Sequence, residues 1–348
     1  MLAEVVRSNA FLPSTDPVVL AACHVMLKPL TDKDIERELF QALTGDLPCA
    51  AEIVGGPGTG KSSCIMKVIR DVARLRDGGH EILLLTAGDV EGALTDTGAF
   101  LYHLIEVIRQ QEFRFADPVQ ERLAGAGAKE ETVREPVVTH TAGVDGGIPV
   151  AKVKYQATLQ QRSKEYKFGE DPARSRGELD DIIKVMRDTG ARPVVVIDDT
   201  DKFAPGDTID EAAVTGLFDH AVQSLAELKI DFVIAVHQRF QDTDAYGRVA
   251  PKYLTTRLAV PYLLLERRPL EPILDRHLEA AGLEPRATEL VDAAAIDTLQ
   301  GLYVGRGRDL RQVLHVVHRA AIVADERRGD RITVEDISAI TEQDNRPR

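Results

Sequence analysis

The chain has 348 residues, of which 44% are hydrophobic and 28% are charged, and its net charge at pH 7 is −13. This composition can build a core, which excludes disorder of the whole chain, and the length corresponds to about two domains. The negative charge argues against a global electrostatic grip on nucleic acid, and the apolar runs fall far short of the ~20 residues of a membrane span.

Residues 1–48 have the pattern of helices separated by turns, since Leu39 and Leu43 lie at helical spacing. A short apolar strand is predicted at 50–54, followed by a glycine-rich turn and a helix. Residues 81–86 form a continuous apolar run, which is typical of a strand buried on both faces of a sheet.

The following elements continue this alternation. Strands are predicted at 194–197, 232–236 and 262–265, and helices near 100–108, 179–186 and 211–228. Strands that alternate with helices imply right-handed crossovers and a mostly parallel sheet. Pro261 lacks an N–H donor, so the strand that it precedes should lie at a sheet edge.

The strand pattern stops at Leu270, beyond which apolar residues recur at helical spacing. We expect helices at 273–283, 287–303, 309–324 and 333–340. The predicted organisation is an N-terminal helical segment (1–48), an α/β core (49–268) and an all-helical lid domain (269–348).

Residues 125–176 interrupt the alternation of strands and helices. Two extended stretches, 136–142 and 148–159, flank the residues 145–147 (Asp-Gly-Gly), which are a hairpin turn signal. We therefore predict a β-hairpin insertion within the core.

The turn from Gly55 to Ser62 matches the phosphate-loop pattern GxxxxGK[ST] in full. Its glycines let successive backbone N–H groups turn toward a phosphate, and the N-terminus of the following helix adds a positive dipole end. Lys61 can reach the β- and γ-phosphates, and the Ser62 hydroxyl can bind Mg²⁺. The predicted nucleotide contacts of the loop are Gly56, Pro57, Gly58, Thr59, Gly60, Lys61, Ser62 and Ser63.

A second acidic motif follows the apolar strand that begins at Pro193 and reads PVVVIDD. This is the Walker B pattern, in which Asp198 joins Ser62 in the Mg²⁺ shell and Asp199 polarises the attacking water. Asp201 is a third carboxylate nearby, predicted to lie in the following loop, and it is an alternative base.

The three cysteines, Cys23, Cys49 and Cys64, have no CxxC spacing. They fit a reduced compartment and argue against disulfides and against a cysteine zinc site. The histidines, including His315 and His318, form no clear metal-binding pattern, and we interpret them as structural. The N-terminus lacks the pattern of a signal peptide, so we expect a cytoplasmic protein.

With its two motifs the chain resembles the AAA+ ATPase family over about residues 30–340. Within that family it is similar to the branch of replication initiators, transposition ATPases and STAND signalling NTPases. The resemblance implies a P-loop core with a five-stranded sheet in the order 5-1-4-3-2 and a C-terminal helical lid. It also implies ATP and Mg²⁺ as ligands, and self-association in a ring or filament through the nucleotide interface.

Two stretches resemble the sensor motifs of the family. The strand 232–238 looks like the one whose polar end helps to place the lytic water, and His237 or Gln238 would fill that role. The turn 305–310 looks like the sensor-2 turn at the start of a lid helix, so that Arg308 would lie over the phosphates. A solvated surface position is the alternative interpretation for each side chain.

The stretch 253–265 looks like the end of a helix that carries a trans-acting arginine, followed by the fifth strand. Arg257 is the first choice for this arginine finger, and Arg248 is the second. An arginine presented by a neighbouring subunit stabilises the charge that develops on the γ-phosphate. A surface arginine at a helix end is the simpler alternative.

These features predict an ATPase that couples its nucleotide state to a protein or nucleic-acid partner. Walker B pairs Asp with Asp here, where the family usually pairs Asp with Glu, so we expect hydrolysis that is slow or dependent on assembly. A STAND-like switch or scaffold in signalling or antiphage defence, with marginal hydrolysis, is the alternative. The sequence contains no NKxD-type or LSGGQ-like stretch, which disfavours a GTPase and an ABC ATPase.

The segment 152–176 carries seven basic residues against three acidic ones within an acidic chain. Tyr155, Tyr166 and Phe168 are interleaved with these charges. Basic residues with exposed aromatics can hold a phosphate backbone and stack bases. Contact with nucleic acid or with a protein through this segment is one hypothesis, and a solvated hairpin is the other.

Overall fold

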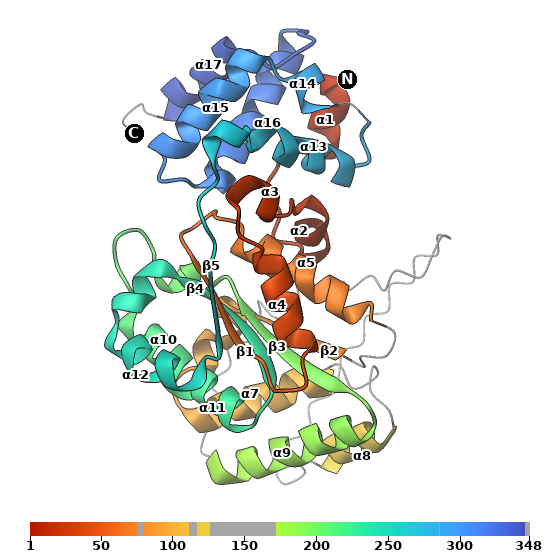
Figure 1. Ribbon diagram of the computed structural model, residues 1–348, viewed down its shortest axis with the longest axis vertical. Coiled ribbons are helices and arrows are strands. Elements are labelled where there is room, and N and C mark those ends of the chain that lie inside the picture. The colour runs from red at the N-terminus through yellow and green to blue at the C-terminus, as the bar shows by residue number, and fades with distance from the viewer. Residues whose placement is uncertain (76–79, 111–116, 126–171, 285, 345–348) are drawn as a thin grey trace, which may run out of the picture.

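The computed structural model describes residues 1–75, 80–110, 117–125, 172–284 and 286–344. An α/β region forms one end of the molecule, and a group of helices forms the other (Figure 1). The N-terminus lies at the helical end, because α1 (Leu2–Ser8) packs against α16 (Leu310–Glu326).

The sheet has five strands in the order β2-β3-β4-β1-β5, and every adjacent pair is parallel. The strands are β1 (Ala50–Gly55), β2 (His80–Thr86), β3 (Arg192–Asp198), β4 (Asp231–His237) and β5 (Thr256–Ala259). The predicted strand order is confirmed. The carboxyl ends of β1, β3 and β4 meet at one edge of the sheet, which is where open α/β sheets bind ligands.

Helices cover both faces of the sheet. Successive strand residues point to opposite faces, so each strand contributes side chains to both cores. On one face, Ile53 and Val196 share a core with the helices α4 (Ile35–Thr44) and α5 (Lys61–Ala73). On the other face, Val195 and Ile234 share a core with the helices α7 (Thr97–Gln110), α9 (Pro172–Asp188), α10 (Glu211–Gly216), α11 (Gln223–Glu227) and α12 (Asp244–Tyr253). The inner strands are therefore buried on both sides, which explains their unbroken apolar sequences.

The remaining elements of the α/β region connect the strands. They are α6 (Ala87–Val90), η1 (Glu91–Ala93), α7 (Thr97–Gln110), α8 (Asp117–Gly125), α9 (Pro172–Asp188), η4 (Thr200–Phe203), α10 (Glu211–Gly216), the π-helical η5 (Leu217–Val222), α11 (Gln223–Glu227), η6 (Gln238–Asp242) and α12 (Asp244–Tyr253). The predicted hairpin at 125–176 lies outside the described residues, apart from its two ends, which belong to α8 and α9.

The fifth strand differs from the prediction, which placed it at 262–265. It is β5, at 256–259, and it pairs with residues 51–54 of β1 at the edge of the sheet. The ladder ends after Val260, whose N–H donates to the carbonyl oxygen of Val54, because the next residue is a proline without an N–H. The apolar residues beyond it leave the sheet, and Leu263 is buried against the helices of the C-terminal region.

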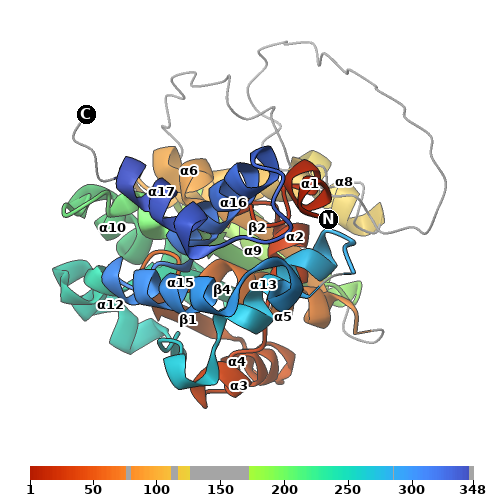
Figure 2. The same cartoon turned by 90° about the horizontal axis from the view of Figure 1, so that it is seen from above.

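The C-terminal helices were largely predicted. They are η7 (Leu265–Arg267), α13 (Leu270–Ala280), α14 (Ala287–Leu290), α15 (Ala293–Gly305), α16 and α17 (Val334–Asp344). The helix expected at 287–303 is two helices, because Val291 leaves the helical path to form a parallel bridge with Ile332. Figure 2 shows α13, α15, α16 and α17 together, lying over the α/β region.

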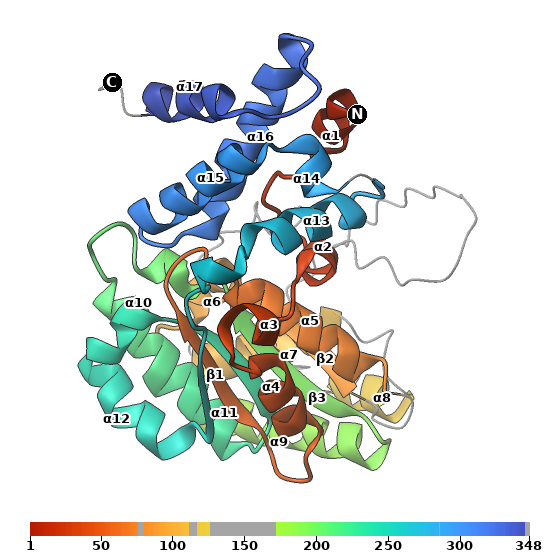
Figure 3. The same ribbon diagram turned by 45° about the horizontal axis from the view of Figure 1, so that its top comes forward.

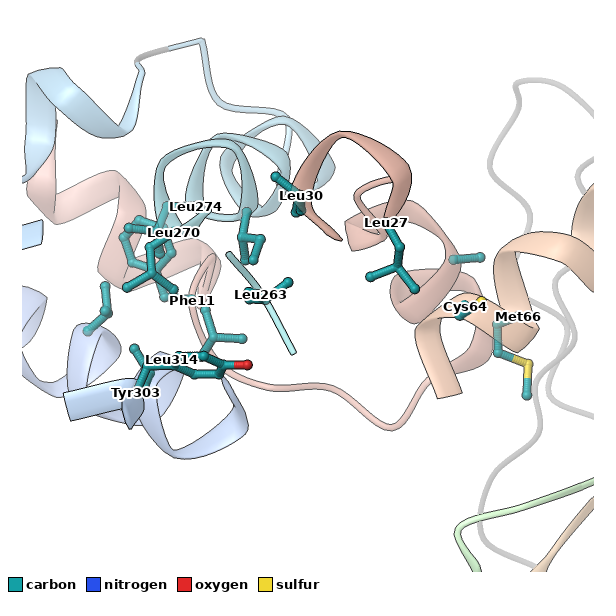
Figure 4. Packing of buried hydrophobic residues seen from close by; sticks show 14 of the residues in the cluster. Phe11, Leu27, Leu30, Cys64, Met66, Leu263, Leu270, Leu274, Tyr303 and Leu314 are labelled. Carbon is teal, nitrogen blue, oxygen red and sulfur yellow. The ribbon is translucent and has the colours of Figure 1, made fainter. Parts of the chain in front are cut away.

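The N-terminal segment connects the two ends of the molecule. Its helix α2 (Pro17–Cys23) packs against both α5 and α13, and α3 (Lys28–Thr31) follows it (Figure 3). Figure 4 shows Leu27 close to Cys64 of α5, and Leu30 on the side of Leu270 and Leu274 of α13. All of these side chains belong to one buried cluster, so the N-terminal segment forms part of a core shared by both ends.

Within the part of the chain that the structure describes, no helix combines the length and the apolar character that crossing a membrane requires.

Candidate functional site

The phosphate loop forms the turn between β1 and α5. Gly58 and Gly60 have φ angles of 64° and 94°, in the left-handed region that favours glycine. Gly58 also lies against α16, because its carbonyl oxygen accepts a hydrogen bond from the N–H of Leu310 at 3.1 Å. A Cβ atom on Gly58 would meet Oδ1 of Asp309 at 1.9 Å. Glycine is therefore required where the C-terminal helices approach the loop.

Lys61 begins α5, and its side chain is buried inside the loop. Its Nζ donates to the carbonyl oxygens of Gly55 and Gly56, at 3.0 and 2.8 Å. It also donates to both carboxylate oxygens of Asp201, at 3.1 and 3.2 Å. A phosphate group offers the same kind of partner, an anionic oxygen acceptor. Lys61 is thus held where a bound phosphate would need it.

Ser62 connects the loop to the end of β3, because its Oγ donates to Oδ1 of Asp198 at 2.9 Å. Burial raises the pKa of Asp198, and hydrogen bonds from the backbone of Asp199 and the hydroxyl of Ser62 act in the opposite direction. A hydroxyl and a carboxylate are hard oxygen ligands, which Mg²⁺ prefers. The two residues predicted to bind Mg²⁺ are therefore adjacent, and they fit that ion chemically.

The two candidate bases differ in their surroundings. Asp199 has a left-handed backbone with φ 61°, and its carboxylate pairs with the exposed Lys202 at 2.8 Å. Asp201 lies in η4, where it contacts Lys61 and lines the pocket next to the loop. The role predicted for Asp199 stays a prediction, and Asp201 is the carboxylate in direct contact with the phosphate loop.

Both candidates for placing the lytic water, His237 and Gln238, lie beside the loop. His237 ends β4 opposite Gly55 of β1 and is buried, and its Nδ1 accepts a hydrogen bond from the N–H of Arg239. Burial lowers the pKa of His237, while the neighbouring Asp201 acts to raise it. The Nε2 atom of Gln238 lies 3.8 Å from the place that a Cβ on Gly56 would occupy.

Arg257 lies within β5, and not at the end of a helix as expected. It stands opposite Glu52 of β1, and its Nε donates to Oε1 of this buried carboxylate at 2.7 Å. Its guanidinium also donates to the hydroxyl of Tyr246. Arg248 lies on α12 and pairs with Asp219 at 2.8 Å. Neither arginine lines the pocket beside the phosphate loop of its own chain. Their action across a subunit interface stays a prediction.

The sensor-2 turn brings a different arginine to the pocket than the one predicted. Arg308 has φ 66°, and its guanidinium lies over the ring of Tyr262, 4.4 Å from the centroid. Arg311, the second residue of α16, lines the pocket with the phosphate loop. The signal that could have found it is Asp309, whose side chain caps α16 by accepting from the N–H of Gln312. A cap at 309 places Arg311 in the first turn.

The pocket itself joins three parts of the chain. The phosphate loop contributes residues 58–63, next to Asp201. The N-terminal segment contributes Pro13, Ser14, Val19, Leu20, Cys23, His24, Val25, Leu27 and Leu30. The C-terminal half contributes Leu263, Ile273, His277, Tyr303, Leu310, Arg311 and Leu314. Sequence reasoning missed these last two groups. Of the predicted loop contacts, Gly56 and Pro57 do not line the pocket.

Most of the basic segment 152–176 lies outside the described residues. Its last two basic residues, Arg174 and Arg176, belong to the exposed face of α9. They pair with Glu178 at 3.1 Å and with Glu227 at 2.6 Å. Their charges are therefore balanced by neighbouring carboxylates.

A comparison with protein-family models finds no match, and a comparison with curated proteins finds none either. Solved structures do match this fold. The Aeropyrum pernix ORC1 protein in complex with DNA is 16% identical, with a TM-score of 0.50 over 89% of this chain and 63% of its own. The Aeropyrum pernix ORC2 protein with ADPNP and ADP is 13% identical, with a TM-score of 0.52 over 90% of this chain and 67% of its own.

The chain shares its fold with these two ORC proteins. This likeness is one of structure at low sequence identity, and it establishes the fold. The chain spans 63% of the ORC1 chain and 67% of the ORC2 chain. The DNA and the nucleotides are bound to the ORC proteins in those structures.

Proposed function

We propose that this protein is a Mg²⁺-dependent AAA+ ATPase that assembles through its nucleotide interface and couples its ATP state to a protein or nucleic-acid partner. The observation that supports this most is the pocket. One end of the pocket is lined by Lys61, Ser62 and Asp201, and Asp198 is hydrogen-bonded to Ser62. The other walls of the pocket are mostly apolar. A triphosphate needs the charged end, and a nucleobase needs the apolar end.

The residues of the charged end have distinct proposed roles. The backbone N–H groups of the loop and the ammonium of Lys61 bind the phosphates. Ser62 and Asp198 hold Mg²⁺, which neutralises charge on the phosphate oxygens when it is bound. Asp199, or Asp201 in its place, accepts a proton from the attacking water. His237 or Gln238 orients that water, and Arg311 or Arg308 closes the site from α16.

Two arginines that do not line the pocket support the proposed assembly. Arg257 and Arg248 do not line it, and both have exposed side chains on elements at or beside the β5 edge of the sheet. An arginine from a neighbouring subunit could then complete the site. We propose the cytoplasm as the location, since none of the three cysteines forms a disulfide.

The second candidate function is a nucleotide-gated switch with marginal hydrolysis. Two contacts favour it. Asp199 is paired with Lys202, and Lys61 is paired with Asp201, so each catalytic group has a partner inside its own chain. Turnover measured against protein concentration separates the candidates, because an assembling ATPase gains turnover per chain and a switch instead retains its nucleotide.

Nucleotide binding is tested with a pair of lysines on the same helix. Lys61→Ala removes a charge-assisted phosphate contact and should weaken Mg-ATP binding by about 2–5 kcal/mol, measured by calorimetry. Lys67 lies two turns further along α5 and pairs with Asp71, so Lys67→Ala is the matched control. Equal ATP affinity for Lys61→Ala and the parent would remove the proposal.

A further inference from the structure

A buried group of three metal-binding side chains lies behind the phosphate loop. His24 follows α2, Glu36 lies in the first turn of α4, and Cys64 lies in the first turn of α5. Their ligand atoms lie within 4.8 Å of one another, and all three residues are buried. Among the residues that the structure describes, they are the one set of His, Cys, Asp and Glu side chains to meet so closely. Their spacing in the sequence gave no sign of this.

Both ring nitrogens of His24 have a polar neighbour. Nε2 lies 2.7 Å from Oε1 of Glu36, and Nδ1 lies 3.3 Å from the hydroxyl of Ser63, which is also 2.9 Å from the carbonyl oxygen of Gly60. Two arrangements satisfy these contacts with a neutral ring. The ring proton lies on Nε2 and is donated to Glu36, or it lies on Nδ1, facing Ser63, and the lone pair of Nε2 is held by a metal cation.

The second carboxylate oxygen of Glu36 distinguishes these two solutions. Oε1 already accepts from the N–H of Leu27 at 2.7 Å, whereas Oε2 is buried and has no hydrogen-bond partner among the described residues. A buried polar atom without a partner destabilises the folded chain. A ring proton on Nε2 leaves Oε2 without a partner, and it leaves the sulfur of Cys64 unused. A metal ion gives both atoms a ligand role.

We propose that His24, Glu36 and Cys64 bind a Zn²⁺ ion that fastens the N-terminal segment to the phosphate-loop helix. Imidazole nitrogen, carboxylate oxygen and thiolate sulfur are the three ligand types of protein zinc sites. Binding breaks the S–H bond of Cys64, forms a Zn–S bond and releases one proton to solvent. The thiolate and the carboxylate then balance the charge of the ion, so the buried site is neutral.

The surroundings supply the other parts of such a site. Ligating histidines usually donate their free N–H to an acceptor, and Ser63 is that acceptor for Nδ1. His24 also lines the pocket beside the phosphate loop, so the ion would enter from this pocket and a water would fill the fourth position. Ligand atoms bound at 2.0–2.3 Å in a tetrahedron lie roughly 3.3–3.8 Å apart, so Nε2 of His24 and Oε1 of Glu36, which are 2.7 Å apart here, would separate as the ion enters between them.

Zinc binding to the full chain is the test. The chain is stripped with a chelator and titrated with Zn²⁺ in competition with a chromophoric chelator, and one equivalent should bind. His24→Gln, Glu36→Gln and Cys64→Ser should each weaken binding more than ~10–100-fold, the loss seen when only a supporting partner of a metal ligand is removed. Cys23→Ser, Cys49→Ser and His277→Gln are matched controls outside the cluster and should bind as the parent does.

Co²⁺ bound to the unaltered chain tests the same site without any substitution, because thiolate ligation gives a charge-transfer absorption band. The proposal fails if no equivalent of Zn²⁺ binds, if Cys64→Ser keeps the affinity of the parent, or if the Co²⁺ complex lacks the thiolate band. Lys61→Ala should retain its zinc. Failure of the zinc site and failure of the ATPase proposal are therefore separate outcomes.

Discussion

The two ends of the pocket are built in opposite ways. The phosphate end comes from one contiguous stretch, 58–63, joined by a carboxylate after β3, whereas the apolar walls come from positions between 13 and 30 and between 263 and 314. Phosphate binding needs backbone N–H groups and a lysine at fixed spacing, which leaves a sequence pattern. An apolar wall needs only side chains of suitable size from any element. The first end is readable from the sequence, and the second is not.

A neighbouring subunit would be a third contributor to the site, and testing it should give the largest change in turnover. Arg257→Lys should lower assembly-dependent turnover by ~10³–10⁵-fold, because lysine cannot reproduce the planar contact of an arginine finger, while ATP affinity stays unchanged. Lysine is chosen because it keeps a cation beside the buried Glu52. Turnover is measured above the assembly concentration, with Arg248→Lys as the comparison.

Mixing variants then shows whether the arginine acts in trans. Arg257→Lys and Asp199→Asn are each inactive alone, but mixed assemblies contain some interfaces with an intact arginine and an intact base. Part of the turnover should return. A mixture that stays inactive, although mixed assemblies form, would assign the finger to Arg248 or leave the site within one subunit.

The second prediction separates chemistry from binding at the phosphate end. Asp199→Asn keeps the shape of the side chain but cannot accept a proton, so turnover should fall at least ~100-fold while ATP still binds. Rates are measured as phosphate release at saturating Mg-ATP, and Lys202→Ala, which removes the partner of Asp199, is the control. If Asp199→Asn keeps its turnover and Asp201→Asn loses it, the base is Asp201.

The third prediction concerns the arginine that reaches the pocket from α16. Arg311→Ala should lower ATP affinity by about 10-fold, a typical loss for a hydrogen bond to a charged group. Arg308→Ala should change it less, because Arg308 lies over the ring of Tyr262 and does not line the pocket. If Arg308 covers the phosphates, as the resemblance implied, calorimetry would show a larger loss of ATP affinity for Arg308→Ala than for Arg311→Ala.

The smallest expected change in ATP affinity comes from a comparison of two neighbouring valines of α2. Val19 lines the pocket and Val18 does not, although both side chains are exposed in part. Val19→Ser should weaken ATP binding by about 1 kcal/mol, roughly fivefold, because it removes apolar contact with the base, and Val18→Ser should have no effect. Tripolyphosphate has no base, so its affinity should be equal in both. A loss of tripolyphosphate affinity in Val19→Ser would show that this wall does not contact the base.

The sequence by itself determined the sheet and the phosphate end of the pocket. Strands that are buried on both faces, such as 194–197, have unbroken apolar sequences. Their alternation with helices predicts a parallel sheet. Gly58, Gly60 and Lys61 have their spacing set by a single turn of backbone. Contacts of this kind form between residues that are close in the chain, so their pattern survives without knowledge of the rest.

Only the tertiary structure decided which distant residues meet. The edge strand begins at Thr256, because its register with β1 is set by inter-strand hydrogen bonds and not by the apolar run after Pro261. Arg311 and Val19 reach the pocket because α16 and α2 pack against the core from outside it. His24 finds Glu36 and Cys64 for the same reason, since three helices or their ends meet there. Packing between elements depends on shape and burial, and neither has a fixed spacing along the chain.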